Sequence, residues 1–317
     1  MPQTPDHYDL SRCKVALILN PKAGKKDARG KVDHMRERIS PAVRELKIHQ
    51  VQKGAQIAEA AHQAVRDGAD IVAAFGGDGT QSAVAGALAE TGVAMAVLPG
   101  GTFNYFAREL GVGDNLDQAL DTLLGGHAGK RHLGAVNERI FINNASFGVY
   151  PEILERREGI YARWGRSRLA AYWSVLVALR ELRDPMHLTI TVDGKTRDVH
   201  TPLAFVARSA FQLDSLGLEG AQAVRDGHFA LFLARRKTRL NLMAASLRLA
   251  LGKVARGQDF DLIITDEMQI ETRKSRRLIA FDGEKERQTG PFRLRVLHDA
   301  LTVMIPKTVI IPKTGEE

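Results

Sequence analysis

Three short apolar runs, each followed at once by a glycine-rich turn, constrain the fold of this chain more than any other feature. The runs cover residues 15–19, 71–75 and 93–98. Segments with helical or further strand character lie between and after them, at residues 31–39, 47–51, 56–65 and 82–88. Strands that alternate with helices at this spacing predict a parallel sheet with helices on both faces. Ligands of such sheets bind at the carboxyl ends of the strands.

The second half of the chain changes from this alternation to a series of short β-prone runs. These runs cover residues 141–147, 187–192, 197–206, 228–233, 261–265, 268–271 and 293–296. The clearest turn between them is Asp193-Gly194, a dipeptide typical of β-hairpins. Such runs between turn signals predict a mainly antiparallel domain. We therefore predict an α/β domain over residues 1–137 and a mainly β domain over residues 138–317, whose C-terminal segment could return to the first domain.

Length, charge and cysteine content narrow the function classes. At roughly 150 residues per domain, a chain of 317 residues favours two domains. Its 45 basic and 37 acidic residues give a net charge of +8, which predicts anionic partners such as nucleotide phosphates, nucleic acid or acidic lipid headgroups. The single cysteine, Cys13, excludes an intrachain disulfide and a cysteine-cluster zinc site, and it favours the reducing cytoplasm. No signal-peptide pattern and no apolar run of about 18 residues is found, so we expect a protein that touches membranes only at their surface, if at all.

The three turns after the apolar runs are candidate phosphate-binding loops. Each leads from a strand into a helix, where backbone amides and the helix dipole can hold phosphate oxygens. Glycine there allows close approach and positive φ values. None of the turns is a Walker loop or a dinucleotide fingerprint, so a P-loop enzyme or a dehydrogenase is not expected. The candidate nucleotide-binding residues are Asn20, Pro21, Lys22, Gly24, Gly76, Gly77, Asp78, Gly79, Thr80, Gly101, Thr102 and Asn104.

Several of these residue types have a structural alternative. Thr80 and Thr102 could equally cap the helices that follow them. Lys22 and the other lysines of the first loop could neutralise a triphosphate or form a solvated charge run. Late in the chain, Asp282-Gly283 is followed by a second carboxylate, Glu284, and from the residues alone it predicts a hairpin turn.

Four motifs follow one another along the chain: NPKAG from Asn20, GGDGT from Gly76, LPGGTFNYFARELG from Leu98 and FDGE from Phe281. GGDGT alone is shared with NAD kinases and phosphofructokinases, whereas NPKAG before it and GGTFN after it are more specific. In their order and spacing, over nearly the whole chain, the motifs resemble the diacylglycerol kinase catalytic-domain family, which includes sphingosine kinases and bacterial lipid kinases. The segment LGAVNERIFINNASFGVYPEI also resembles the family's crossover between its two domains.

The resemblance implies a fold, an activity and cofactors. Family members place ATP between a Rossmann-like parallel-sheet domain and an antiparallel β-sandwich domain, and they transfer the γ-phosphoryl group to a lipid hydroxyl. We therefore expect a lipid kinase that uses ATP and Mg²⁺, with a diacylglycerol-like or sphingoid acceptor. Two alternatives stay open: an NAD-kinase-like small-molecule kinase, and a non-catalytic relative that binds nucleotide or lipid.

The resemblance also gives roles to three carboxylates. Asp78 becomes a candidate for orienting magnesium-bound water or nucleotide, with an aspartate turn or a helix cap as its structural alternative. Asp282 and Glu284 become candidates for the general base that accepts the proton of the lipid hydroxyl, and the resemblance does not decide between them. One departure is Tyr105, which stands where many members have an aspartate of an Asp–water–magnesium network. Its presence is the reason to keep the non-catalytic alternative.

Two long segments, residues 154–183 and 233–256, have the basic and aromatic or leucine-rich composition of interfacial amphipathic stretches. They would bring a cytoplasmic enzyme to its lipid substrate at a membrane surface, with anionic phospholipids as partners. The alternative is that their apolar faces pack on a sheet. No nucleic-acid-binding signature accompanies the charge, so nucleic acid is not an expected partner. We predict a cytoplasmic protein associated peripherally with membranes, and homo-oligomer formation stays open.

Overall fold

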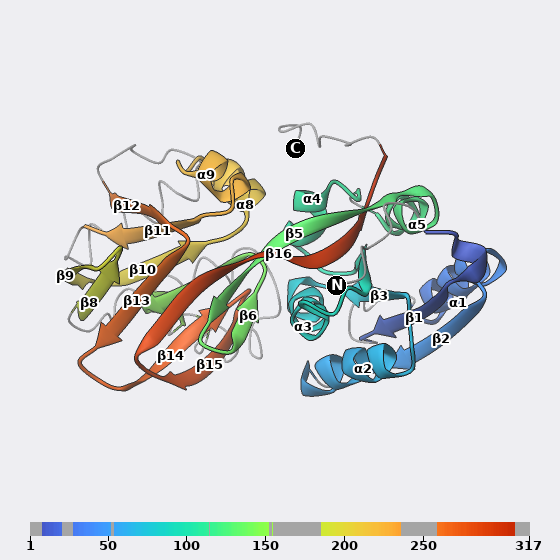
Figure 1. The fold of residues 1–317 in the computed structure, drawn as a ribbon, viewed down its shortest axis with the longest axis horizontal. Helices are drawn as coiled ribbons and strands as arrows, with labels where there is room; N and C mark the ends of the chain where they lie inside the picture. Colours follow the sequence, from blue (N-terminus) through green and yellow to red (C-terminus); the bar gives the residue numbers. More distant parts are fainter. Residues whose placement is uncertain are drawn as a thin grey trace, which may run out of the picture. The chain divides into compact units, whose positions relative to one another are not determined.

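The computed structural model of the protein describes residues 8–20, 28–51, 54–113, 115–151, 154, 185–235 and 259–307. The chain divides into two compact units, one made of residues 1–133 and 297–317 and the other of residues 134–296. The first unit contains a parallel sheet with helices, and the second is mainly antiparallel (Figure 1). The predicted fold class is therefore confirmed.

The parallel sheet of the first unit brings successive strand ends to one edge. Its strands are β1 (Lys14–Leu19), β2 (Glu45–Gln50), β3 (Ile71–Gly76) and β4 (Ala94–Pro99), in the order β2-β1-β3-β4. β1, β3 and β4 are buried almost throughout, whereas the edge strand β2 is partly exposed. Burial on both faces is the reason that the inner strands appear in the sequence as continuous apolar runs.

Helices cover both faces of this sheet. They are α1 (Ala28–Ile39), α2 (Gly54–Arg66), α3 (Asp78–Leu88), α4 (Tyr105–Leu110) and α5 (Leu116–Gly125), with short 3₁₀ turns at Leu10–Arg12 and Ser40–Ala42. α2 packs against α3 on one face, and α1 packs against α5 on the other (Figure 1). Right-handed crossovers produce this distribution for this strand order.

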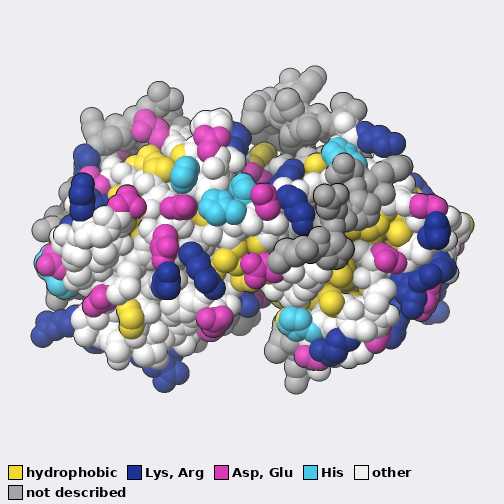
Figure 2. All heavy atoms as spheres, viewed as in Figure 1, with side chains coloured by type: hydrophobic (Ala, Val, Ile, Leu, Met, Phe, Trp, Pro, Cys, Tyr) yellow, Lys and Arg dark blue, Asp and Glu magenta, His cyan; other side chains and the backbone are white. Residues whose placement is uncertain are grey.

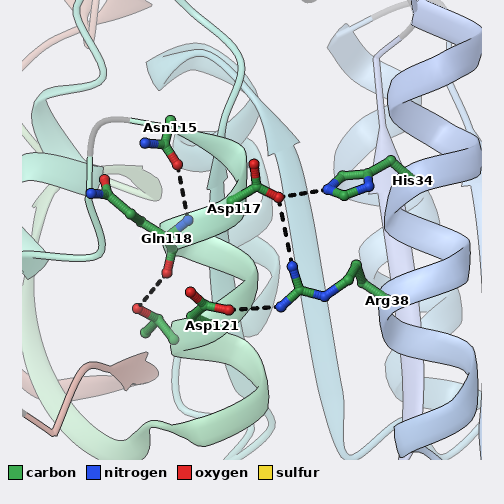
Figure 3. A network of polar contacts seen from close by, with 7 residues as sticks. His34, Arg38, Asn115, Asp117, Gln118 and Asp121 are labelled. Atoms are coloured by element: carbon green, nitrogen blue, oxygen red, sulfur yellow. Dashed lines mark hydrogen bonds and ion pairs between the residues drawn. The ribbon is translucent and has the colours of Figure 1, made fainter.

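A polar network fastens α5 to α1 (Figure 3). His34 Nε2 lies 2.6 Å from Asp117 Oδ1, and Arg38 Nη2 donates to Asp121 Oδ1 at 2.7 Å. Asn115 begins α5 by accepting a hydrogen bond from a backbone N–H of its first turn. Because the charged groups are exposed, these pairs orient the two helices and add little to the free energy of unfolding.

The second unit is a β-sandwich whose two sheets enclose one apolar core. One sheet has the order β12-β11-β10-β7-β14-β15, and the other contains β8, β9, β13 and the first part of β16. Core side chains come from both sheets and include the buried rings of Phe147, Phe281 and Phe292. The bounds of the remaining strands are β5 His127–Val136, β6 Arg139–Phe141, β7 Asn144–Gly148, β8 Met186–Val192, β9 Lys195–Thr201, β10 Leu203–Ala207, β11 Phe229–Ala234, β12 Phe260–Thr265, β13 Glu267–Thr272, β14 Arg276–Phe281, β15 Glu284–Thr289 and β16 Phe292–Ile305.

Two short helices, α8 (Ala210–Ser215) and α9 (Ala221–Arg225), lie on the other face of the six-stranded sheet (Figure 1). Their apolar side chains form a second, smaller core with Phe232 of β11 and Ala207 of β10. Two buried polar residues, Arg208 and Ser209, connect the end of β10 to the start of α8.

Several strands differ from what the sequence predicts. The predicted runs 141–147 and 197–206 are each divided into two strands, and β14 and β15 were not among the predicted runs, although the turn between them was predicted. β5 was not predicted, because its sequence HAGKRHLGAV mixes glycine and charge where a strand pattern would be apolar. β16 is 14 residues long, although only residues 293–296 were predicted as a strand. Its first part pairs with β13, where Leu294 lies opposite Met268, and its last part pairs with β4, where Thr302 lies opposite Ala94. β16 therefore contributes to both units.

The predicted hairpin at Asp193-Gly194 is confirmed between β8 and β9. Val192 pairs with Lys195, so the two turn residues are the whole loop. Both have positive φ, 49° at Asp193 and 72° at Gly194, as a type I′ turn requires.

This turn predicts a measurable cost of backbone conformation. Gly194→Ala should lower the free energy of unfolding by about 1–2 kcal/mol, because alanine is strained at positive φ. The added Cβ meets no atom within 4 Å, so no steric clash contributes. Gly125→Ala, at the end of α5 and equally free of contacts, is the matched control and should be neutral or slightly stabilising. Urea unfolding followed by circular dichroism compares the two, and equal free energies would contradict the left-handed conformation at Gly194.

Candidate functional site

The loops after β3 and β4 lie against each other, backbone to backbone. Gly76 pairs with Pro99 in the parallel ladder, so both loops leave the sheet at the same edge. The Gly100 N–H donates to the Gly76 carbonyl oxygen at 2.9 Å. A Cβ on Gly101 would lie 2.6 Å from the Gly77 Cα, and a Cβ on Gly77 would lie 3.3 Å from the Gly101 Cα. Glycine at these positions is therefore required for the contact between the loops.

The conformation of these loops differs from one expectation. Gly77 has a φ of −83°, so the positive φ expected for the loop glycines does not occur there. Gly79 is the second residue of α3, inside the helix. In the structure, Gly77 allows the close approach of the loop after β4. A role of these glycines in binding phosphate stays a prediction.

Side-chain hydrogen bonds lock both loops in place. Asn104 has a left-handed backbone, and its amide group both accepts from the Gly101 N–H at 2.9 Å and donates to the Gly101 carbonyl at 3.0 Å. Asp78 Oδ1 accepts from the backbone N–H of Phe106 at 3.3 Å, which links the start of α3 to the first turn of α4. Gln81 Nε2 donates to the Gly76 carbonyl at 3.1 Å. The edge of the sheet is thus a connected and ordered surface.

Neither threonine caps a helix, contrary to one of the two interpretations of the sequence. The N-cap of α3 is Gly77, and Thr80 lies in the first turn, buried, with its side chain next to the Gly76 Cα. Thr102 is exposed, and the residue that precedes α4 is Asn104. A nucleotide-binding role of Thr80 and Thr102 stays a prediction.

Only the beginning of the first loop belongs to the described residues. The Asn20 backbone N–H lies 3.4 Å from the Phe75 carbonyl oxygen, so Asn20 leaves β1 beside the end of β3. Pro21, Lys22 and Gly24, with Lys25 and Lys26, lie outside the residues that the structure describes.

Tyr105, which stands where many family members have an aspartate, is the first residue of α4. Its ring stacks on Phe103 with a centroid separation of 5.6 Å and an angle of 3° between the ring planes. Phe103 is 55% exposed. The position therefore offers an aromatic surface where a carboxylate would offer a metal ligand.

In the second unit, the predicted hairpin of the FDGE motif is confirmed. Phe281 of β14 pairs with Glu284 of β15, and the two residues between them have positive φ, 50° at Asp282 and 84° at Gly283. This turn places its two carboxylates in different surroundings: Asp282 is 8% exposed, whereas the Glu284 side chain is 57% exposed.

Asp282 uses its carboxylate to hold the backbone of the neighbouring segment. Oδ1 accepts from the N–H groups of Asn143 at 2.7 Å and Asn144 at 3.0 Å, and Oδ2 accepts from the N–H of Ile142 at 2.9 Å. The Asp282 N–H in turn donates to the Asn144 carbonyl at 3.0 Å. Backbone N–H groups thus already occupy both oxygens of this carboxylate, and Asp282 acts as a structural clamp.

Glu284 has the opposite character. Desolvation by the surrounding protein atoms raises the pKa of its carboxyl group above the usual value, and the negative charges of Asp282 and Glu286 raise it further. Arg139 lowers that pKa in part, with its Nη2 at 3.7 Å from Glu284 Oε2. An exposed carboxylate with a raised pKa is suited to accept a proton. Arg139 was not a candidate in the sequence, because no local motif links it to the FDGE turn.

The described residues also bear on the expected metal and membrane contacts. Among them, no group of three or more His, Cys, Asp or Glu side chains could hold a metal ion. Within the same residues, no helix has the length and the apolar composition to cross a membrane. The two segments predicted to face lipid, residues 154–183 and 233–256, lie outside the described residues except for Leu154 and the end of β11 with Arg235.

Comparisons with known proteins agree on one family. Residues 14–136 match the family model described as the diacylglycerol kinase catalytic domain, and residues 151–305 match the YegS C-terminal NAD kinase beta sandwich-like domain. Proteins named diacylglycerol kinase from Staphylococcus aureus strains bovine RF122 / ET3-1 and MRSA252 are each 30% identical over 144 residues, 45% of this chain. The aligned region spans 46% of these relatives, about half of their length.

A solved structure extends the similarity over nearly the whole chain. The crystal structure of a diacylglycerol kinase from Bacillus anthracis str. Sterne superimposes with a TM-score of 0.72 and 22% sequence identity. The superposition covers 94% of this chain and 98% of that chain. At this identity the similarity is one of fold.

The contact between the glycine loops predicts an asymmetric effect of two alanine substitutions. Gly101→Ala should lower the free energy of unfolding by about 1–3 kcal/mol, since its Cβ would lie 2.6 Å from backbone that cannot turn away. Gly77→Ala should cost less, because its Cβ meets the same contact at 3.3 Å. Thermal and urea unfolding of both variants measure the difference. A Gly101→Ala protein as stable as the parent would contradict the packing of the two loops.

The Asp282 clamp predicts a larger loss of stability. Asp282→Ala leaves three backbone N–H groups without their acceptor, so the free energy of unfolding should fall by about 3 kcal/mol or more. Asp282→Asn keeps one acceptor oxygen and should lie between this variant and the parent. Asp193→Ala is the matched control, since Asp193 has the same left-handed turn position without the three N–H contacts. If both alanine variants lose the same free energy in urea, the clamp contributes nothing.

Proposed function

Because the chain belongs to the diacylglycerol kinase catalytic-domain family, we propose that it is an ATP-dependent lipid kinase. It transfers the γ-phosphoryl group of ATP to the hydroxyl group of a diacylglycerol-like or sphingoid lipid. The observation that carries this proposal is the pair of interlocked glycine loops at the carboxyl edge of a parallel sheet, in a chain that also holds an exposed carboxylate at the FDGE turn.

The loops after β3 and β4 are the proposed phosphate-binding surface. The helix dipole places partial positive charge at the start of α3. Asp78 and Gly79 begin that helix, and Gly101 lies directly against Gly77. Phosphate oxygens placed here would meet a backbone that is already fixed in position, so little ordering is required on binding.

A magnesium ion fits this surface as a companion of the nucleotide. Magnesium keeps several waters and is commonly held by one or two carboxylates together with substrate phosphates. Asp78, the carboxylate at the start of α3, is the residue that would hold the ion or one of its waters. The bound ion would neutralise phosphate charge.

Glu284 is the proposed general base. Phosphoryl transfer needs a positioned hydroxyl and a group that accepts its proton. Of the two carboxylates of the FDGE turn, Asp282 is buried and occupied by three N–H groups, whereas Glu284 is exposed and has a raised pKa. We therefore assign to Glu284 the role of accepting the proton of the lipid hydroxyl, and to Asp282 the role of stabilising the turn.

The substrate class places the protein at a membrane surface, as a peripheral and cytoplasmic enzyme. The net charge of +8 favours anionic phospholipids. On the face drawn in Figure 2, Lys and Arg side chains are interspersed with Asp and Glu.

An assay with radiolabelled ATP and a panel of acceptors tests the proposal. The panel contains detergent-solubilised diacylglycerol, a sphingoid base and NAD, and thin-layer chromatography separates the products. Label in a lipid product is the expected result. Label in NADP would instead support the second candidate, a small-molecule kinase, which the NAD kinase-like description of residues 151–305 favours. ATP-dependent thermal stabilisation without any labelled product would indicate a non-catalytic relative.

The base assignment predicts a specific loss of turnover. Glu284→Gln should lower kcat by about 10² or more, because the glutamine cannot accept the proton. Activity of the parent should rise as the pH rises through the raised pKa of Glu284, since the base is active when deprotonated. Glu271→Gln, an exposed glutamate of β13 that contacts Gln269, is the control and should keep the parent kcat. A fully active Glu284→Gln variant would exclude this residue as the base.

A further inference from the structure

We propose that Arg139 is a positioning residue that holds the Glu284 carboxylate for proton transfer, a role that rests on the proposed kinase function. Arg139 lies at the start of β6, far from the FDGE turn in sequence and next to it in space. Its side chain is 32% exposed, so part of its charge is withdrawn from water. Electrostatic pairing is stronger at such a site than on an open surface.

The first step of the inference is that the backbone fixes Arg139 and Glu284 relative to each other. β6 continues directly into residues 142–144, whose N–H groups bind the Asp282 carboxylate. Asp282 therefore ties the strand that carries Arg139 to the turn that carries Glu284. Because the tie consists of three buried hydrogen bonds, the fold sets the distance between the backbone segments that carry the two side chains.

The second step is that an aromatic ring limits where the guanidinium can lie. The Arg139 Cζ is 5.9 Å from the centroid of the Phe281 ring, a cation–π contact. Phe281 is 1% exposed and belongs to the core of the sandwich, so it cannot move away. The Phe281 ring therefore limits the position of the Arg139 guanidinium, and β6 fixes its backbone.

The third step is that the Arg139 guanidinium forms ion pairs with two carboxylates of β15. Nη2 lies 3.7 Å from Glu284 Oε2, and Nε lies 3.6 Å from Glu286 Oε2. The Nε atom is buried and makes no hydrogen bond. Both distances exceed those of a direct hydrogen bond, so the loss of one carboxylate would let the guanidinium approach the other.

This arrangement makes Glu286 a competitor for Arg139. The charged groups that act on Glu284 are Arg139 of β6, Asp282 of the turn and Glu286 of its own strand. Arg139 lowers the pKa of Glu284, while Asp282 and Glu286 raise it. Substitutions of Arg139 and Glu286 should therefore move the titration of Glu284 in opposite directions.

The test measures kcat against pH for Arg139→Gln, Arg139→Lys and Glu286→Gln. Arg139→Gln should lower kcat roughly 5- to 10-fold and move the acid limb of the profile to higher pH, with the KM for ATP unchanged. Glu286→Gln should move the same limb to lower pH. Arg139→Lys keeps the charge without the planar fork, so it should keep the position of the limb and recover only part of kcat. Circular dichroism and thermal unfolding confirm that each variant is folded.

The role of Arg139 through Glu284 predicts non-additive effects. In a Glu284→Gln background, Arg139→Gln should cause no further loss of kcat. A further loss equal to that in the parent would overturn the inference, because Arg139 would then act on the reaction by another route. An acid limb that stays in place in both Arg139→Gln and Glu286→Gln would also overturn it.

A second measurement does not depend on turnover. A carbon-13 NMR titration of the Glu284 carboxyl carbon, assigned by its loss in Glu284→Gln, should show the same opposite shifts in the two variants. If those shifts are found in a protein that phosphorylates no acceptor, the electrostatic pairing holds and the kinase proposal fails. If Glu284→Gln is inactive and neither the NMR titration nor the kcat profile moves, the kinase proposal holds and the positioning role fails.

Discussion

The close approach of two backbones at the edge of a parallel sheet is the constraint on which the first unit depends. β3 and β4 are neighbours in register, so their following loops meet, and they can touch only where glycine leaves room for a Cα against a Cα. The side chains of Asn104, Asp78 and Gln81 then close each loop onto that contact. The result is a set of backbone amides held in one arrangement by covalent geometry and packing, before any ligand is present.

In the second unit, a turn fixes the positions of two carboxylates, Asp282 and Glu284, that are separated by Gly283. A two-residue turn with two positive φ values sends Asp282 inward, to three N–H groups, and leaves Glu284 at the surface. Chemically similar groups thereby acquire different hydrogen-bond partners and different exposure to water. Asp282 fixes the turn that carries Glu284. Through its hydrogen bonds to residues 142–144, it also fixes the end of the strand that carries Arg139.

The sequence predicts those parts of the fold in which a local pattern has one physical cause. β1, β3 and β4 are buried on both faces and therefore appear as apolar runs. The two hairpin turns each contain an Asp-Gly pair, and these residue types tolerate the positive φ that the turns require. β5 was missed because its pairing partners, and not its own residues, make it a strand. Thr80 looks like a cap until the helix is seen to begin before it, and Arg139 carries no signal because its partner lies in a distant segment. The predicted ligands of the nucleotide remain predictions, since a side chain that shapes a loop and one that binds phosphate follow the same motif.

The long strand β16 has a consequence for how the protein is made. The first unit contains residues 1–133 and 297–317, so the strand that completes its sheet beside β4 is synthesised after the second unit. At about 5–20 residues per second, a ribosome needs on the order of ten seconds to translate the intervening segment. During that time the apolar edge of β4 is open while the whole sandwich emerges. The sheet of the first unit can therefore be completed only after the second unit has been synthesised.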